Sequence, residues 1–267
     1  MLDFWKAHAY GNDFLYVRQD DVEHTSLAGL ARQMCDRHTG VGADGLIVFE
    51  GSGNEVHMRL FNADGSRAEV SGNGVRALGA LLLRDDTRPG QSVAIHTDAG
   101  VKRLTKLAHE GTLQTFRASM GAPAGIERIL PFEIAGATVQ PVVLSMGNPQ
   151  CVIVGPLPDD DAFRRIGAAL ERHELFPEGT NVEFADVEAP DRVRILIWER
   201  GVGPTSSSGT GSCAALVACA SFGGAEHVAD VIAPGGPQRV EWLPDAVYLT
   251  GWAEVLCSGE WCRDLPD

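Results

Sequence analysis

The sequence predicts an α/β (α+β) protein built from two similar halves, each with strands wrapped around one central apolar helix. Three observations support this prediction. A set of short motifs recurs at an offset of about 137 residues. Helical periodicity occurs at the same two places in each half. One helix of each half is almost wholly apolar, which is typical of a helix enclosed by other elements.

The repeat consists of four pairs of motifs that keep the same order in both halves. Common glycines could produce one such match by chance, but four in order indicate a duplicated unit. The pairs are Gly11-Asn12 with Gly147-Asn148, Gly42-Ala43-Asp44 with Gly179-Thr180-Asn181, Phe61-Asn62 with Trp198-Glu199, and Ser71-Gly72-Asn73-Gly74 with Ser208-Gly209-Thr210-Gly211.

The hydrophobic pattern predicts four helices, nine strands and a division into two domains. We expect a first domain of residues 1–118, to which a C-terminal strand within 255–267 returns, and a second domain of residues 119–254. The predicted helices span 26–38, 72–84, 160–173 and 209–222, and the strands 46–49, 56–61, 93–96, 113–118, 139–145, 151–154, 181–187, 192–199 and 247–252.

The charge of the chain argues against two classes of partner. With 22 basic and 36 acidic residues the formal net charge is −14, so nucleic acid and anionic membrane surfaces would be repelled. The apolar runs 77–83 and 214–220 are far shorter than the roughly 20 residues of a membrane-spanning helix. The first residues lack the apolar stretch of a signal peptide. We therefore expect a cytoplasmic protein that binds a small molecule.

The two Ser-Gly-x-Gly motifs are the candidate functional sites. Each precedes an apolar helix, so its backbone N–H groups carry the partial positive charge of a helix start and favour an anion. Duplication would direct both helix starts toward one ligand at the domain interface. Such a site suits removal of a proton from one face of a stereocentre and its return on the other. Symmetry assigns the two bases to Ser71 and Ser208, although serine is also among the best N-cap residues.

The shared-site hypothesis makes two structural predictions. The Ser71 and Ser208 hydroxyls should face each other about 7 Å apart, which leaves room for one α-carbon between two near-contact approaches. Gly74 and Gly211 should lie where the helix approaches the ligand, so that a Cβ would intrude there.

The chain resembles the diaminopimelate epimerases through segments that cover nearly its whole length. They are GNDF, RHTGVGADGL, FNADGSRAEVSGNGVRALG, MGNPQCV, GTNVEF and ERGVGPTSSSGTGSCAA. The resemblance implies two pseudo-symmetric domains, each a mainly antiparallel curved sheet around a central helix. It also implies cofactor-independent interconversion of LL- and meso-2,6-diaminopimelate for lysine and peptidoglycan biosynthesis. The implied substrate contacts are Asn12, Asn62, Gly72, Asn73, Asn148, Asn181, Glu199, Arg200, Gly209 and Thr210.

The chain departs from the family pattern at the residues that matter most for catalysis. The family uses two catalytic cysteines, where this sequence has Ser71 and Ser208. It usually has a histidine at Gln150 and commonly a glutamate at Pro204, whereas Glu199, expected beside the second catalytic position, is present. An alcohol is a far weaker acid than a thiol and needs an adjacent base. We therefore assign the catalytic role to Ser71, Ser208 and Glu199.

Three functions remain open from the sequence. The first is an epimerase in which serines still move protons. The second is a racemase, isomerase or dehydratase of another small amino acid. The third is a catalytically silent amino-acid-binding protein, natural or made by replacing cysteines. We expect no cofactor and no metal, because the sequence contains neither nucleotide-binding motifs nor metal-ligand spacing. A homodimer is the commonest assembly and stays possible.

Overall fold

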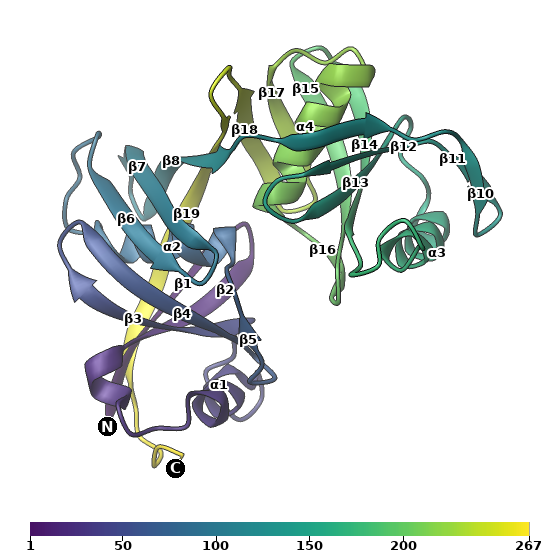
Figure 1. Cartoon of the computed structure of the whole chain (residues 1–267). Coiled ribbons are helices and arrows are strands. Elements are labelled where there is room, and N and C mark those ends of the chain that lie inside the picture. The colour runs from purple at the N-terminus through teal and green to yellow at the C-terminus, as the bar shows by residue number, and fades with distance from the viewer. Residues whose placement is uncertain (267) are drawn as a thin grey trace. The chain divides into compact units, whose positions relative to one another are not determined.

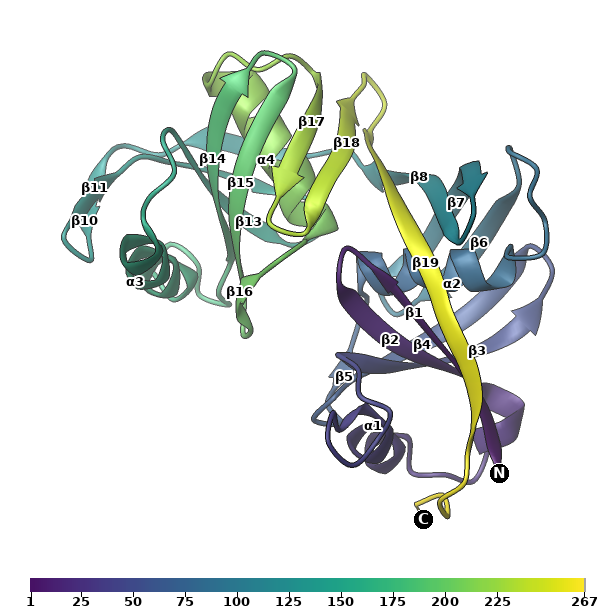
Figure 2. The ribbon, with the colours of Figure 1, turned by 180° about the vertical axis from the view of Figure 1, so that it is seen from behind.

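The computed structural model describes residues 1–266, with only the backbone described at Ser52, and divides into two compact units. Unit 1 comprises Met1–Ala118 and the segment from Gly251 onward, and unit 2 comprises Ser119–Thr250. Both units combine sheet with few helices (Figures 1 and 2), so the predicted α+β class is confirmed. Within the described residues no helix is both long enough and apolar enough to span a membrane.

Unit 1 surrounds the helix α2 with strands. The C-terminal part of β19 pairs with β1, and the order continues through β2, β3, β4, β6, β7 and β8, with parallel pairs only at β2–β3 and β4–β6. Its elements are β1 (Leu2–Ala9), β2 (Asn12–Arg18), η1 (Gln19–Val22), α1 (Leu27–Cys35), β3 (Gly45–Ser52), β4 (Glu55–Asn62), β5 (Arg67–Ala68), α2 (Gly72–Leu82), β6 (Ser92–Thr97), β7 (Gly100–Glu110) and β8 (Leu113–Gly121).

Unit 2 repeats this arrangement around α4. The order is β9, β12, β13, β14, β15, β17, β18 and the first part of β19, with parallel pairs only at β13–β14 and β15–β17. Its elements are β9 (Ala124–Arg128), β10 (Phe132–Ile134), β11 (Ala137–Val139), β12 (Pro141–Ser145), β13 (Pro149–Val154), α3 (Asp160–Glu171), β14 (Asn181–Ala189), β15 (Arg192–Glu199), β16 (Gly203–Thr205), α4 (Gly209–Phe222), β17 (Val228–Ala233), β18 (Gly236–Trp242) and β19 (Val247–Trp261).

The two central helices are buried because their side chains are small or apolar on nearly every face. Nine of the 11 residues of α2 and ten of the 14 of α4 are buried. Each helix packs inside its own hydrophobic cluster, with Leu78 in one and Leu216 in the other. The outer face of each sheet is covered by the second helix, α1 over β3 and α3 over β14. The central strands therefore have a core on both faces.

The structure corrects several predicted boundaries. The helix expected over 26–38 ends at Cys35, because Asp36 accepts the N–H groups of His38 and Thr39 in a turn. The strand expected over 139–145 is interrupted at Gln140, since Val139 belongs to the separate β10–β11 hairpin. Strands β1, β2, β5, β7, β9, β10, β16, β17 and β18 were not predicted. The C-terminal part of β19 runs beside β1 (Figure 2), and Leu2 pairs with Trp261.

Candidate active site

Ser71 and Ser208 occupy the same position at the two central helices. Each is the N-cap residue, and its hydroxyl accepts the backbone N–H of the glycine three residues later, at 3.1 Å from Gly74 and 3.2 Å from Gly211. The alternative N-cap role is thus present in both. A hydroxyl that accepts one hydrogen bond keeps its own proton to donate. Ser208 is buried, whereas Ser71 is half-buried.

In unit 2 the hydroxyl of Ser208 has a carboxyl partner. Glu199, the last residue of β15, lies beside Ser208, whose hydroxyl lowers the pKa of the Glu199 carboxyl. Burial raises the pKa of Glu199 above its usual range, and Ser208 only partly opposes this shift. A carboxyl with a raised pKa is suited to exchange a proton near neutral pH. The predicted pair of Ser208 and Glu199 is therefore assembled.

Other predicted residues of unit 2 form local hydrogen bonds. The Asn181 side chain accepts the backbone N–H of Arg200 at 2.9 Å, and the Arg200 guanidinium donates to the Glu178 carbonyl at 3.0 Å. Asn148 accepts from the Gln150 amide at 2.7 Å. Gln150 is fully buried. Arg200 is exposed, so its guanidinium is accessible to an anionic group.

In unit 1 two of the predicted asparagines form a chain of hydrogen bonds that ends at Asp44. Asn73 donates to Asn12 at 3.4 Å, and Asn12 donates to Asp44 at 2.7 Å. The buried guanidinium of Arg76 donates to Asn73 at 3.1 Å and lies over the Tyr10 ring. Sequence reasoning missed Arg76 and Tyr10. A charged residue within an otherwise apolar helix was the signal that could have identified Arg76.

The remaining predicted residues differ in accessibility. Asn62 is exposed and donates to Ser66 within its own turn. Gly72 is exposed with open space where a Cβ would lie, whereas Gly209 is buried against Leu249. Thr210 is half-buried on the first turn of α4.

The expected role of Gly74 and Gly211 is wrong. A Cβ on Gly74 would lie 2.8 Å from the Ile47 Cδ1 atom, and one on Gly211 would lie 2.6 Å from a Glu183 carboxyl oxygen. Both glycines therefore accommodate the protein's own side chains from the strand beneath the helix.

Strand registers also correct the alignment of the two halves. Phe14 pairs with Gly45 in unit 1, as Gln150 pairs with Asn181 in unit 2, so Gly45 and not Asp44 corresponds to Asn181. In the same register Ile47 corresponds to Glu183, a residue absent from the sequence prediction. On the next strand the predicted match of Asn62 with Glu199 holds. Gly45 pairs with Asn62 in unit 1, and in unit 2 Val182 pairs with Trp198, the residue before Glu199.

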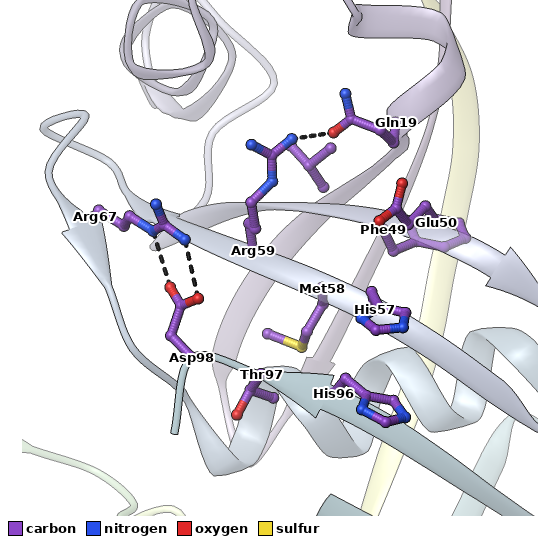
Figure 3. A pocket seen from close by; sticks show the side chains of 11 residues that line it. Gln19, Phe49, Glu50, His57, Met58, Arg59, Arg67, His96, Thr97 and Asp98 are labelled. Carbon is purple, nitrogen blue, oxygen red and sulfur yellow. Dashed lines mark hydrogen bonds and ion pairs between the residues drawn. The ribbon is translucent and has the colours of Figure 1, made fainter. Parts of the chain in front are cut away.

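A surface hollow of about 200 Å³ lies elsewhere in unit 1 (Figure 3). The predicted site residues do not line it. Both arginines that line it are bound locally, because Arg67 binds Asp98 through two hydrogen bonds and Arg59 binds Gln19. Over the described residues, no three His, Cys, Asp or Glu side chains gather to hold a metal ion. Neither feature competes with the helix starts as the candidate active site.

Comparison with known proteins shows the family of the chain. The family model "Diaminopimelate epimerase" matches residues 4–124 and 142–256. The diaminopimelate epimerase of Desulforudis audaxviator is 38% identical, over 98% of this chain and 100% of that protein. That of Pelotomaculum thermopropionicum is 39% identical, over 97% and 99%. A solved probable proline racemase from Agrobacterium radiobacter, 15% identical, shares the fold with a TM-score of 0.73 over 99% of this chain and 94% of that one. The chain therefore belongs to the diaminopimelate epimerase family and is an enzyme of the isomerase class.

Proposed function

We propose that this protein interconverts LL- and meso-2,6-diaminopimelate by proton transfer at the α-carbon, without a cofactor. The observation that carries the proposal is the placement of Glu199, at the end of β15, beside Ser208, at the start of α4. It supplies a base beside one of the two serines that stand in place of the family's cysteines. The membership in the epimerase family supplies the substrate class.

The proposed chemistry in unit 2 uses both side chains. The Glu199 carboxylate takes a proton, directly or from the Ser208 hydroxyl as that oxygen takes the α-proton, and the substrate retains the electron pair. The α4 backbone N–H groups and the positive end of the helix dipole favour the substrate carboxylate, where negative charge then accumulates. The exposed Arg200 guanidinium would pair with the distal carboxylate.

The proposed chemistry in unit 1 is weaker, because Asn62 occupies the position that corresponds to Glu199. An amide cannot accept a proton as a carboxylate does. Without a carboxylate at the position of Glu199, Ser71 would exchange protons more slowly than Ser208. Proton removal from the unit 2 side should be faster than removal from the unit 1 side.

Solvent deuterium incorporation tests this proposal. LL- and meso-diaminopimelate are incubated separately in D₂O with the protein, alongside a panel of other amino acids, and analysed by mass spectrometry and chiral chromatography. We expect slow deuterium incorporation that is faster with one stereoisomer than with the other. It should also be faster than inversion of configuration at the α-carbon. The rate should fall as the pH falls through the raised pKa of Glu199. Glu199→Gln should abolish it.

Three results would contradict the proposal. Exchange only with other amino acids would favour a different racemase or isomerase. Binding without exchange would indicate an amino-acid-binding protein. Equal exchange from both stereoisomers would contradict the predicted difference between the two serines. Ser258→Ala, a change at an exposed position of β19 in unit 1, serves as a control for assay variation.

A further inference from the structure

Glu183 is a carboxyl group placed inside an apolar core. It lies on β14 opposite Ile197 of β15, and its neighbour along the same face, Ala185, packs in the cluster around α4. The residue is completely buried. The strand is covered on its other face by α3, so the side chain has no route to solvent through the sheet.

Neither carboxyl oxygen of Glu183 has a hydrogen-bond partner. One of them lies against the start of α4, since a Cβ on Gly211 would come within 2.6 Å of it. The charge that acts on Glu183 is Glu199. The packed elements also carry the thiols Cys151 of β13 and Cys213 and Cys219 of α4, the carboxyls Asp186 and Glu188 of β14, and the guanidinium groups Arg192 and Arg194 of β15, whereas α4 itself carries no charged residue.

Glu183 cannot be ionised at low energetic cost in this environment. A buried carboxylate without a partner is strongly disfavoured, and a second carboxylate nearby disfavours it further. Burial and the Glu199 charge together hold the pKa of Glu183 well above its usual range. Burial also raises the pKa of Glu199, but Ser208 lowers it in part. Glu199 therefore ionises before Glu183.

The fold itself does not require a carboxyl at this position. The corresponding residue of unit 1 is Ile47, which packs beneath Gly74 as Glu183 packs beneath Gly211. Ile47 belongs to the apolar cluster around α2. The carboxyl thus occurs only in the unit whose serine also has a glutamate partner.

We propose that Glu183 is a positioning residue for the proposed reaction: it retains the one proton that it and Glu199 share at neutral pH, so that Glu199 is the ionised carboxylate beside Ser208. This inference rests on the proposed function only for its catalytic consequence. Two carboxyls that interact in a dry site ionise in two steps. The first ionisation creates the base at Glu199. The second would place another negative charge beside the developing carbanion.

Infrared spectroscopy tests where the proton resides without reference to activity. At neutral pH exposed carboxyls are ionised, so a carboxylic acid C=O band reports a buried protonated group. We expect this band in the parent protein, its loss in Glu183→Gln and its retention in Glu199→Gln. Glu183→Leu, which imitates the apolar unit 1 position, gives a second variant if the glutamine form does not fold. Ile47→Leu is the matched control and should retain the band.

The pH profile of α-proton deuterium exchange tests the consequence. In Glu183→Gln the acid limb of this profile should stay in place, and the exchange rate should stay within about threefold of the parent rate. The alkaline limb should move up by about one pH unit or more, because the second ionisation is absent. A purely structural role would lower the rate equally at every pH.

The two assays separate the inference from the proposed function. If the acid band belongs to Glu183 but no diaminopimelate exchange occurs, the proposed function fails and the assigned protonation stands. Exchange accompanied by no acid band, or by a band lost only in Glu199→Gln, overturns the inference. An alkaline limb that is unchanged in Glu183→Gln also overturns it.

Discussion

The two N-cap serines are the residues on which activity depends most directly. Thiolate is accessible near neutral pH and alkoxide is not, so Ser71→Cys combined with Ser208→Cys should raise α-proton exchange at least about tenfold, or about 1.4 kcal/mol of barrier. Single-turnover deuterium wash-in measures the gain.

The exposed Ser206 provides a control for this experiment, because Ser206→Cys makes the same chemical change two residues before the helix cap. It should leave exchange unchanged. A lower rate in the double cysteine form, with affinity retained, would instead show that the protein has specialised in serine chemistry.

The close approach of Gly74 to Ile47 gives a residue-scale prediction of stability. Gly74→Ala places a methyl group against the Ile47 Cδ1 atom and should cost about 1–3 kcal/mol of unfolding free energy. Ile47→Val removes that same atom. Urea denaturation of both single variants and the double variant should therefore show that the double variant loses less unfolding free energy than the two single variants lose together. Strict additivity would mean that the helix shifts as a whole.

At the scale of elements, the end of α2 depends on a buried lysine. The Lys106 ammonium of β7 donates to the Leu83 carbonyl at 2.6 Å and to the Asp86 carbonyl, so it satisfies groups that the helix end leaves open. Lys106→Met should cost about 1–3 kcal/mol, measured by urea denaturation. Lys102→Met on the same strand is the control and should cost less. Equal losses would show that the capping contacts are not decisive.

Elements with a regular apolar pattern could be predicted from the sequence, and those with mixed patterns could not. The helix over 209–222 and the strand over 192–199 have the predicted bounds, because their periodicity is uninterrupted. Strand β1 escaped prediction because Lys6 and His8 interrupt its apolar pattern. The Lys6 ammonium binds Asp13 and the Gly42 carbonyl, so a charged residue sits within a structured strand.

The same reasoning explains which site residues could be found. Ser71, Ser208 and Glu199 are identified by the repeat. Glu183 was missed because Asn181, Val182, Glu183 and Phe184 alternate as if one face of β14 met solvent. Both faces are instead covered by helices, a fact that depends on tertiary packing.

At the scale of the whole molecule, the last strand belongs to both units. Residues 247–250 of β19 pair with β18, and residues 254–261 pair with β1. A chain that ends after Glu254 loses the strand that covers Leu2 and Phe4 with Trp261. We expect this chain to unfold or aggregate, as judged by circular dichroism and size-exclusion chromatography.

A chain that ends after Cys262 is the matched control for this truncation. It keeps every β1–β19 pair and loses tail contacts: the Pro266 carbonyl that accepts the Ser26 N–H, the packing of Leu265 against the cluster that contains Leu2, and the position of Arg263 over the Trp261 ring. It should fold with a small loss of stability. Normal folding of the shorter chain would show that β1 does not need this neighbour.

Between the positions of Gly45 and Asn62 in unit 1, and the corresponding Asn181 and Glu199 in unit 2, unit 2 has one residue more, and this residue lies at a β-bulge. In unit 2 Val187 pairs with Val193 and Ala189 with Arg192, so Glu188 is the extra residue, while the equivalent hairpin of unit 1 pairs without interruption. A bulge confines an added residue to one place, whereas an unaccommodated insertion would reverse the facing of every later side chain. One codon could therefore be gained or lost at the hairpin end after duplication. At the other end of both strands, which carries Asn62 and Glu199, each side chain still faces the same side of the sheet.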